Sequence, residues 1–341
     1  YLKIKDFNLK VKDNIITNCN KISLDGKDFI YDIFYNENKI IIIGNVLITK
    51  EIEYEKIYIT SEKHKIIKDN ILCSEGADSY FVIVYIVQSD TNLNNILVEF
   101  NYLNIKKILM LNNYCVFLSK FNLDMCISTL FKNDYMQFYN WYNYYKKKGI
   151  NTFVLYYNDK IQNLDENFIN FICNSCDVIL FEWSHIYYYF VDYCDIADSI
   201  KHHHDNKCKN RIANAQLQSL NHCLYLLKPQ CDYLLICDFD EYLIVDNMTE
   251  ITTKIEDTPG LLFNTLFSSI TYENKLIEYE HGNCGRYKYI VNVKKVIELH
   301  IHGFLQNECG FSELFSNDYV FSHIINFKED RIEYFSTCKH R

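Results

Sequence analysis

The chain has 341 residues, 49% of them hydrophobic and 23% charged, which is typical of a globular protein with one large or two medium domains. Its net charge is −9 and it has no dense cluster of Lys and Arg, which argues against nucleic acid as a partner. No apolar stretch reaches the roughly 18–20 residues that a membrane span needs, and no signal peptide is visible.

The 14 cysteines are scattered along the chain. Many lie in apolar runs, as Cys115, Cys126 and Cys237 do, where Cys behaves as a small hydrophobic residue. This distribution does not indicate a disulfide framework and favours a reducing, cytoplasmic compartment. The alternative is the lumen of the Golgi or the ER, with an N-terminal anchor that is not part of this sequence.

Residues 1–120 contain short apolar runs separated by turn signals. Examples are residues 40–43 before Gly44-Asn45, and residues 81–87 before Ser89-Asp90. The enrichment in β-branched residues and the short spacing predict strands. Because these residues contain no chemical motif, we expect a β-rich accessory domain of unknown role.

From residue 121 onward, predicted strands and helices alternate. Strands are expected at 125–130, 152–157, 178–181 and 233–237, and helices at 134–148, 167–173 and 213–227. Asp134 is the expected cap of the first helix, and Gly149 and Pro229 follow the first and third. This alternation predicts an α/β domain over residues 121–341, with a mainly parallel twisted sheet flanked by helices.

Polar residues follow three of these strands, at 132–134, 158–159 and 238–241, where ligands bind in parallel sheets. The most informative is Asp238-Phe239-Asp240-Glu241. In extended backbone, Asp238 and Asp240 project to the same side, where two carboxylates repel each other unless a cation lies between them. A divalent metal that carries a phosphorylated ligand is the natural candidate, which indicates a nucleotide-sugar site.

Several segments between residues 124 and 330 share a resemblance to one family. They are residues 126–134, Asn140-Trp141 with 148–150 and 153–159, residues 216–223, the acidic segment 238–243, Lys288-Tyr289-Ile290-Val291, His302, and Ser322-His323. Together these segments resemble glycosyltransferase family 92, which has a nucleotide-sugar-binding fold of the GT-A type. The first 120 residues or so lie outside the resemblance.

The resemblance implies a transferase that moves a sugar, with galactose favoured, from a UDP-sugar to a glycan or glycoprotein acceptor with inversion. It implies Mn²⁺ or Mg²⁺ as cofactor. Asp240 is the expected direct ligand, Asp238 is expected to contact the ribose or a metal-bound water, and His323 is the expected third ligand.

Further roles follow from the same resemblance. Lys288 is expected to neutralise the diphosphate, while Asn133 and Asp134 are expected to hold the uridine, with Asp159 at the neighbouring strand end. An inverting mechanism needs a general base. For this role we select Glu313 over Glu308 and Asp318, with Asp238 as the other catalytic residue; Glu241 is expected to support the aspartates or to pair with a basic side chain.

Two other functions stay open. A catalytically inactive nucleotide-sugar or glycan-binding module would keep the fold, although it has no need of the intact acidic residues. A hydrolase would place two carboxylates roughly 5–9.5 Å apart across a sugar.

The run His202-His203-His204-Asp205 with Cys208 matches no zinc module in its spacing, so we expect a polar loop there. The sequence does not name the donor sugar, the acceptor, the linkage or the oligomeric state.

Overall fold

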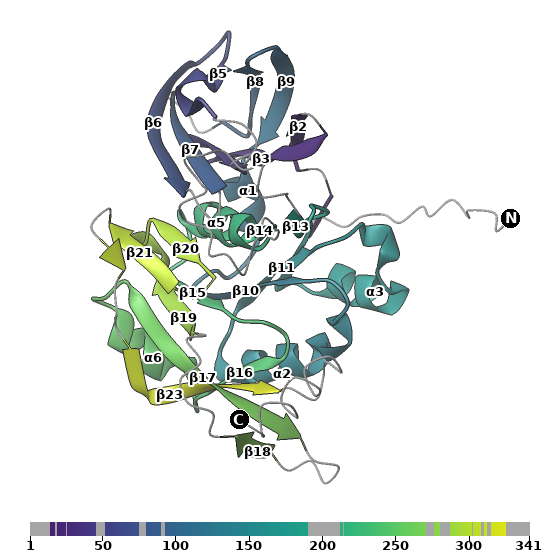
Figure 1. Ribbon diagram of the computed structural model, residues 1–341, viewed down its shortest axis with the longest axis vertical. Helices are drawn as coiled ribbons and strands as arrows, with labels where there is room; N and C mark the ends of the chain where they lie inside the picture. The colour runs from purple at the N-terminus through teal and green to yellow at the C-terminus, as the bar shows by residue number, and fades with distance from the viewer. Residues whose placement is uncertain are drawn as a thin grey trace, which may run out of the picture.

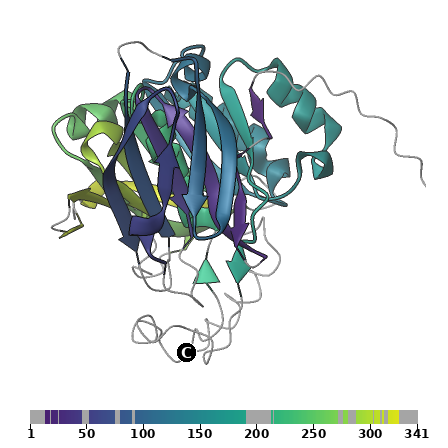
Figure 2. The same ribbon diagram turned by 90° about the horizontal axis from the view of Figure 1, so that it is seen from above.

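The computed structural model describes residues 14–17, 19–24, 26–45, 52–74, 80–89, 93–189, 212–213, 215–270, 276–279, 287–301, 303–307, 310–311 and 315–324. The antiparallel strands of the first third of the chain lie at the top of Figure 1, above a large mixed sheet with helices. In Figure 2, seen from above, the purple and blue N-terminal strands lie over the rest of the chain. In the described residues, no helix is long and apolar enough to cross a membrane.

The N-terminal strands form two antiparallel sheets, with strand orders β2-β3-β4-β7-β6 and β5-β8-β9. Their bounds are β2 Ile22–Leu24, β3 Lys27–Asn36, β4 Lys39–Gly44, β5 Tyr58–Thr60, β6 Lys65–Ser74, β7 Tyr80–Gln88, β8 Asn95–Tyr102 and β9 Ile105–Asn112, with the short helix η1 at Tyr54–Lys56. The strands predicted from the apolar runs at 40–43 and 81–87 are therefore confirmed as β4 and β7.

The large sheet has the strand order β1-β12-β11-β10-β15-β19-β17-β23-β16, and β18 pairs with β17. Its strands are β1 Ile15–Ile16, β10 Met125–Phe131, β11 Thr152–Tyr157, β12 Val178–Glu182, β15 Tyr233–Ile236, β16 Glu241–Ile244, β17 Gly260–Ile270, β18 Leu276–Tyr279, β19 Tyr287–Asn292 and β23 Phe315–Ile324. The half from β1 to β15 is parallel, as predicted, whereas β19 pairs antiparallel with β15 and begins a mixed half. The sheet as a whole is therefore mixed.

Helices cover both faces of this sheet. They are α1 Tyr114–Leu118, α2 Phe138–Lys148, α3 Glu166–Asn174, α5 Ala215–Leu227 and α6 Met248–Ile255, with short helices η2 Tyr135–Gln137, η3 Ile161–Asn163 and η5 Val293–Lys295. Small antiparallel pairings join β13 Tyr188–Tyr189 to β14 Ile212–Ala213, and β20 Glu298–His300, β21 Gly303–Asn307 and β22 Gly310–Phe311 to one another. Gly149 ends α2 in the left-handed region, with φ 102°, as predicted.

Helix α5 is buried almost all round because it lies between the N-terminal strands and the large sheet (Figure 1). On β7, alternate residues face opposite ways: Tyr80 and Val82 belong to the core around α5, and Phe81 and Ile83 to the core between the two N-terminal sheets. Burial on both faces explains the continuous apolar run in this strand. A third core, under α2, α3 and α6, packs against the opposite face of the large sheet.

A buried polar chain also joins the N-terminal strands to α5. The hydroxyl of Tyr156 lies 2.8 Å from Nδ1 of His222, whose Nε2 lies 3.1 Å from Oδ2 of Asp32 on β3. Asn36, also on β3, donates to the carbonyl oxygens of Tyr225 and Leu226. Since buried polar groups are costly when unpaired, these bonds specify one docking arrangement of β3 on α5.

Candidate functional site

The acidic segment is a turn between two strands of the large sheet. Strand β15 lies between β10 and β19 and ends at Ile236, and β16 begins at Glu241. Between them, the backbone N–H of Glu241 donates to the carbonyl oxygen of Asp238 at 3.1 Å. The extended backbone expected at Asp238 and Asp240 is therefore wrong; a turn brings their carboxylates together instead.

The aromatic residue within the turn anchors it to the core. Phe239 is buried, and its ring centroid lies 5.0 Å from that of Phe131, 5.1 Å from that of Trp141 and 5.6 Å from that of Phe138. Strand β10 and helix α2 thus hold Phe239 on one side. Trp141 is itself fully buried, so the contact with Phe239 lies in the core.

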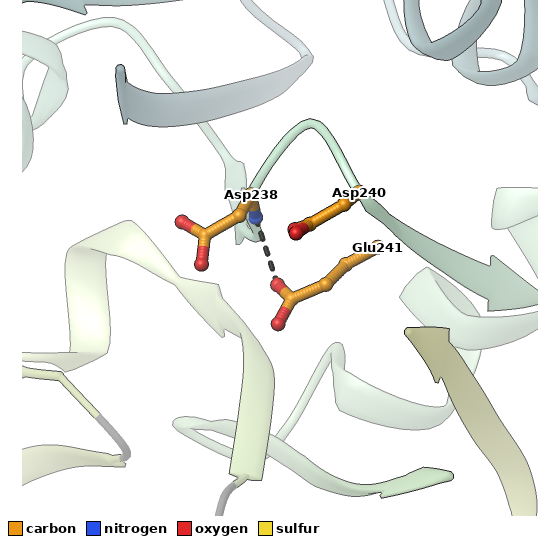
Figure 3. Close-up of side chains that lie close together, drawn as sticks. All are labelled: Asp238, Asp240 and Glu241. Carbon is orange, nitrogen blue, oxygen red and sulfur yellow. Dashed lines mark hydrogen bonds between the residues drawn. The ribbon is translucent and has the colours of Figure 1, made fainter. Parts of the chain in front are cut away.

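The carboxylates of Asp238, Asp240 and Glu241 form one cluster (Figure 3). Each offers an oxygen, and these oxygens lie within 4.8 Å of one another. Asp240 is fully buried and the Glu241 side chain is 3% exposed, whereas the Asp238 side chain is 31% exposed. The backbone N–H of Asp238 donates to Oε2 of Glu241 at 2.8 Å, so Glu241 holds the turn from within.

Lys288 supplies a positive charge to this cluster from β19. Its Nζ lies 2.9 Å from Oε2 of Glu241 and 3.1 Å from Oδ2 of Asp238, and its side chain is almost fully buried. Burial alone would lower the pKa of Lys288, but the charges of Asp238 and Glu241 outweigh burial and hold this pKa well above its ordinary value. The expectation that Glu241 pairs with a basic side chain is confirmed.

His323 comes to the same place from the far end of the chain. Strand β23 pairs antiparallel with β16, and the register sets His323 directly opposite Glu241. The side chain of His323 lies outside the described part of the structure, as do Glu308, Glu313 and the 202–208 segment as a whole. Asp318 lies on β23, where only its backbone is described.

A cavity of about 690 Å³ opens at the carboxyl ends of the three parallel strands next to β15. It is lined by Lys132 after β10, residues 158–160 after β11, and residues 184–187 after β12. At its edge, Nζ of Lys132 lies 3.5 Å from Oδ2 of Asp159. The cavity and the acidic turn therefore share one edge of the sheet.

Of the three residues predicted to hold the nucleoside, only Asp159 lines the cavity. Asn133 is exposed, and Oδ1 of Asp134 accepts a hydrogen bond from the backbone N–H of Lys132 at 3.3 Å, which indicates a local structural role. The loop after β12, with His185, was missed at the sequence level. The sequence signal for this loop was its position directly after a predicted strand. Trp183-Ser184-His185 contains no carboxylate that would have drawn attention to it.

The comparison with known families agrees with this geometry. The family model described as Glycosyltransferase family 92 matches residues 121–339, well over half of the chain. The chain belongs to glycosyltransferase family 92. It is therefore a glycosyltransferase with a donor and an acceptor substrate, and a mixed α/β fold with a partly parallel sheet is compatible with that activity. No curated protein matches the chain.

The acidic turn, Lys288, His323 and the cavity all lie within the matched residues of this family 92 enzyme. Strands β1–β9 lie outside them. The match therefore covers the sheet edge where the candidate site lies, and leaves the role of the N-terminal strands to be argued from their contacts.

Proposed function

We propose that this family 92 enzyme transfers a sugar from a UDP-sugar to a glycan or glycoprotein acceptor with inversion, assisted by Mn²⁺ or Mg²⁺ at the acidic turn. The observation that carries the proposal is the position of the turn beside the cavity at one edge of the parallel strands. Galactose as the transferred sugar, and inversion, rest on the family resemblance alone.

The distance between the acidic turn and the cavity suits a nucleoside diphosphate. Strand β10 separates β15, which carries the turn, from β11, which carries Asp159. Neighbouring strands lie about 4.8 Å apart, so the turn and Asp159 are separated by roughly 10 Å along the sheet edge. A nucleoside in the cavity can therefore extend its diphosphate toward the acidic turn, with Lys132 and Lys160 at the cavity as further cations.

The acidic turn fits a divalent cation in both charge and donor type. Three ionised carboxylates and one ammonium group give the cluster of Asp238, Asp240, Glu241 and Lys288 a formal charge of −2. Oxygen donors suit Mn²⁺ and Mg²⁺, and Mn²⁺ also accepts imidazole, which is consistent with His323 opposite Glu241. A bound ion would neutralise the charge that develops on the departing diphosphate.

The chain's own groups have distinct proposed tasks. Asp240 and Asp238 hold the cation, His323 completes its ligands, and Lys288 keeps Asp238 and Glu241 in place and faces the diphosphate as a fixed positive charge. Glu313 stays our proposed general base at the acceptor hydroxyl.

We extend the proposal to the fold and the compartment. The parallel half-sheet, followed by an acidic turn at a strand end, supports a GT-A type domain over residues 121–341 and a β-rich domain over residues 1–120. Cytoplasmic localisation is supported by the buried free thiols of Cys126, Cys223 and Cys231.

A panel of UDP-sugars tests the proposal, with transfer and hydrolysis measured in EDTA and in Mn²⁺. Wild type should turn over at least one UDP-sugar in Mn²⁺ only, and Asp240→Asn should abolish that turnover. Asp246→Asn, at an exposed aspartate shortly after the turn, is the matched control and should match wild type. UDP binding without any turnover would instead support the inactive module, and metal-free glycan hydrolysis would support the hydrolase.

A further inference from the structure

The loop after β12, residues 183–187, forms one wall of the cavity and is fixed from two sides. From the segment directly after β11, Nδ2 of Asn158 donates to the carbonyl oxygens of Trp183 and His185 at 2.9 and 2.8 Å. From the N-terminal strand β3, Oδ2 of Asp28 lies 3.2 Å from Nδ1 of His185 and accepts from the backbone N–H of Ile186 at 3.4 Å. A residue outside the family match therefore reaches the wall of the donor cavity.

The surroundings of Asp28 make its contact with His185 firm. Nζ of Lys21 lies 2.5 Å from Oδ1 of Asp28, and the ring of Tyr31 on β3 lies 4.0 Å from the ring of His185. The side chains of both Asp28 and His185 are more than nine-tenths buried. Within the described part of the chain, no protein group hydrogen-bonds to Nε2 of His185, the ring nitrogen opposite the contact with Asp28.

These contacts determine which ring nitrogen carries the proton. Burial lowers the pKa of His185 to about 4, against the opposing effect of Asp28, so the imidazole is neutral at pH 7. Burial raises the pKa of Asp28, but hydrogen bonds from His185 and Lys21 outweigh it and lower this pKa to about 2. A carboxylate can only accept, so the proton of the neutral imidazole lies on Nδ1, and Nε2 is a hydrogen-bond acceptor.

We infer that Asp28 is a positioning residue for base recognition: it holds His185 in the Nδ1–H form, so that Nε2 accepts a hydrogen bond from an N–H on the edge of the donor's base. Uracil has such a donor at N3, whereas cytosine has an acceptor there. The inference rests on the proposed function, and it assigns to the N-terminal strands a part in selecting uridine over cytidine nucleotides.

The test is the ratio of the dissociation constants for CDP and UDP, measured by calorimetry in Mn²⁺ at a temperature where every variant is folded. For wild type we expect a ratio of at least about tenfold, because cytosine would set a lone pair against Nε2. In Asp28→Asn the amide can donate to Nδ1 and move the proton to Nε2, so the ratio should fall by about tenfold.

The matched control is Asp32→Asn. Asp32 is also a buried β3 aspartate that contacts a histidine, but its partner His222 lies on α5 and does not line the cavity. This variant should lose stability and keep the wild-type ratio. A general loss of packing would lower both affinities together and leave the ratio unchanged, so the ratio reports on base recognition alone.

His185→Ala provides a second variant in case Asp28→Asn does not fold. It should lose the discrimination, and adding Asp28→Asn to it should change the ratio no further. If wild type binds UDP but the ratio is unchanged in Asp28→Asn or in His185→Ala, the inference is wrong and the proposed donor class stands. If wild type binds neither nucleotide, the proposed function fails and the inference fails with it.

Discussion

Replacing Lys288 by Met is the sharpest test of the acidic turn. Lys288 is buried with two carboxylate contacts at 2.9 and 3.1 Å, so the variant leaves Asp238 and Glu241 without their counter-charge. At an effective dielectric constant of 20, each contact is worth about 5 kcal/mol of attraction, most of which the desolvation of the charges offsets. Removing one partner of a buried pair costs about 3–5 kcal/mol, and we expect that loss in EDTA.

The same variant should bind a divalent cation more tightly than wild type. Without Lys288, the formal charge of the cluster changes from −2 to −3, because three carboxylates then lack a neighbouring ammonium group. A cation that binds the folded state raises its stability by mass action. Mn²⁺ should therefore restore much of the stability lost in Lys288→Met, and should raise the melting temperature of the variant more than that of wild type.

The assay is thermal unfolding of both proteins in EDTA and in Mn²⁺. At about 2 °C per kcal/mol for a large domain, the loss in EDTA corresponds to roughly 6–10 °C. Lys294→Met is the control, because Lys294 pairs with Asp232 at 2.6 Å in an exposed position worth at most about 1 kcal/mol. If Lys288→Met and Lys294→Met lost equal stability in EDTA, the reasoning about the buried ion pairs would be refuted. If Mn²⁺ left the difference in melting temperature between Lys288→Met and wild type unchanged, the cation site would be refuted.

Three further predictions concern the turn, the loop after β12 and helix α2. Phe239→Ala removes the buried ring that anchors the turn, and should cost about 3–5 kcal/mol by chemical denaturation and lower kcat in Mn²⁺; unchanged kcat would show that the anchor does not position the turn. His185 has a folded pKa of about 4 against 6.5 when unfolded, so the unfolded state takes up its proton first as the pH falls. Stability should drop by about 3 kcal/mol between pH 6.5 and 4, and His185→Gln should show a flatter pH profile. Gly149→Ala, at φ 102°, should cost about 1 kcal/mol and leave donor affinity unchanged, and no loss on denaturation would contradict the helix end described for α2.

Much of the parallel half of the sheet was predictable, because local patterns determine it. The strand expected at 152–157 is β11 with the same bounds, and the helix expected at 167–173 is α3 at Glu166–Asn174. Gly149 ends α2 where the sequence predicts. Such segments follow from apolar periodicity and from capping and turn residues, which act over a few positions.

The second half of the sheet was not predictable in the same way. Strands β17, β19 and β23 add to the parallel strands in an order that differs from their order in the chain, and β17 runs parallel to β23. Pairing between strands far apart in sequence depends on which edges and faces remain to be covered, and no local pattern records it.

The sequence by itself singled out Asp238–Glu241 as the candidate site, because carboxylates directly after a buried strand repel one another unless a cation lies between them. Only the tertiary structure decided what faces them. The register of β15 with β19 brings Lys288 into the cluster, and the register of β16 with β23 sets His323 opposite Glu241. Likewise, the docking of β3 on the large sheet brings Asp28 to His185, 157 residues away, because burial and hydrogen bonding act through space rather than along the chain.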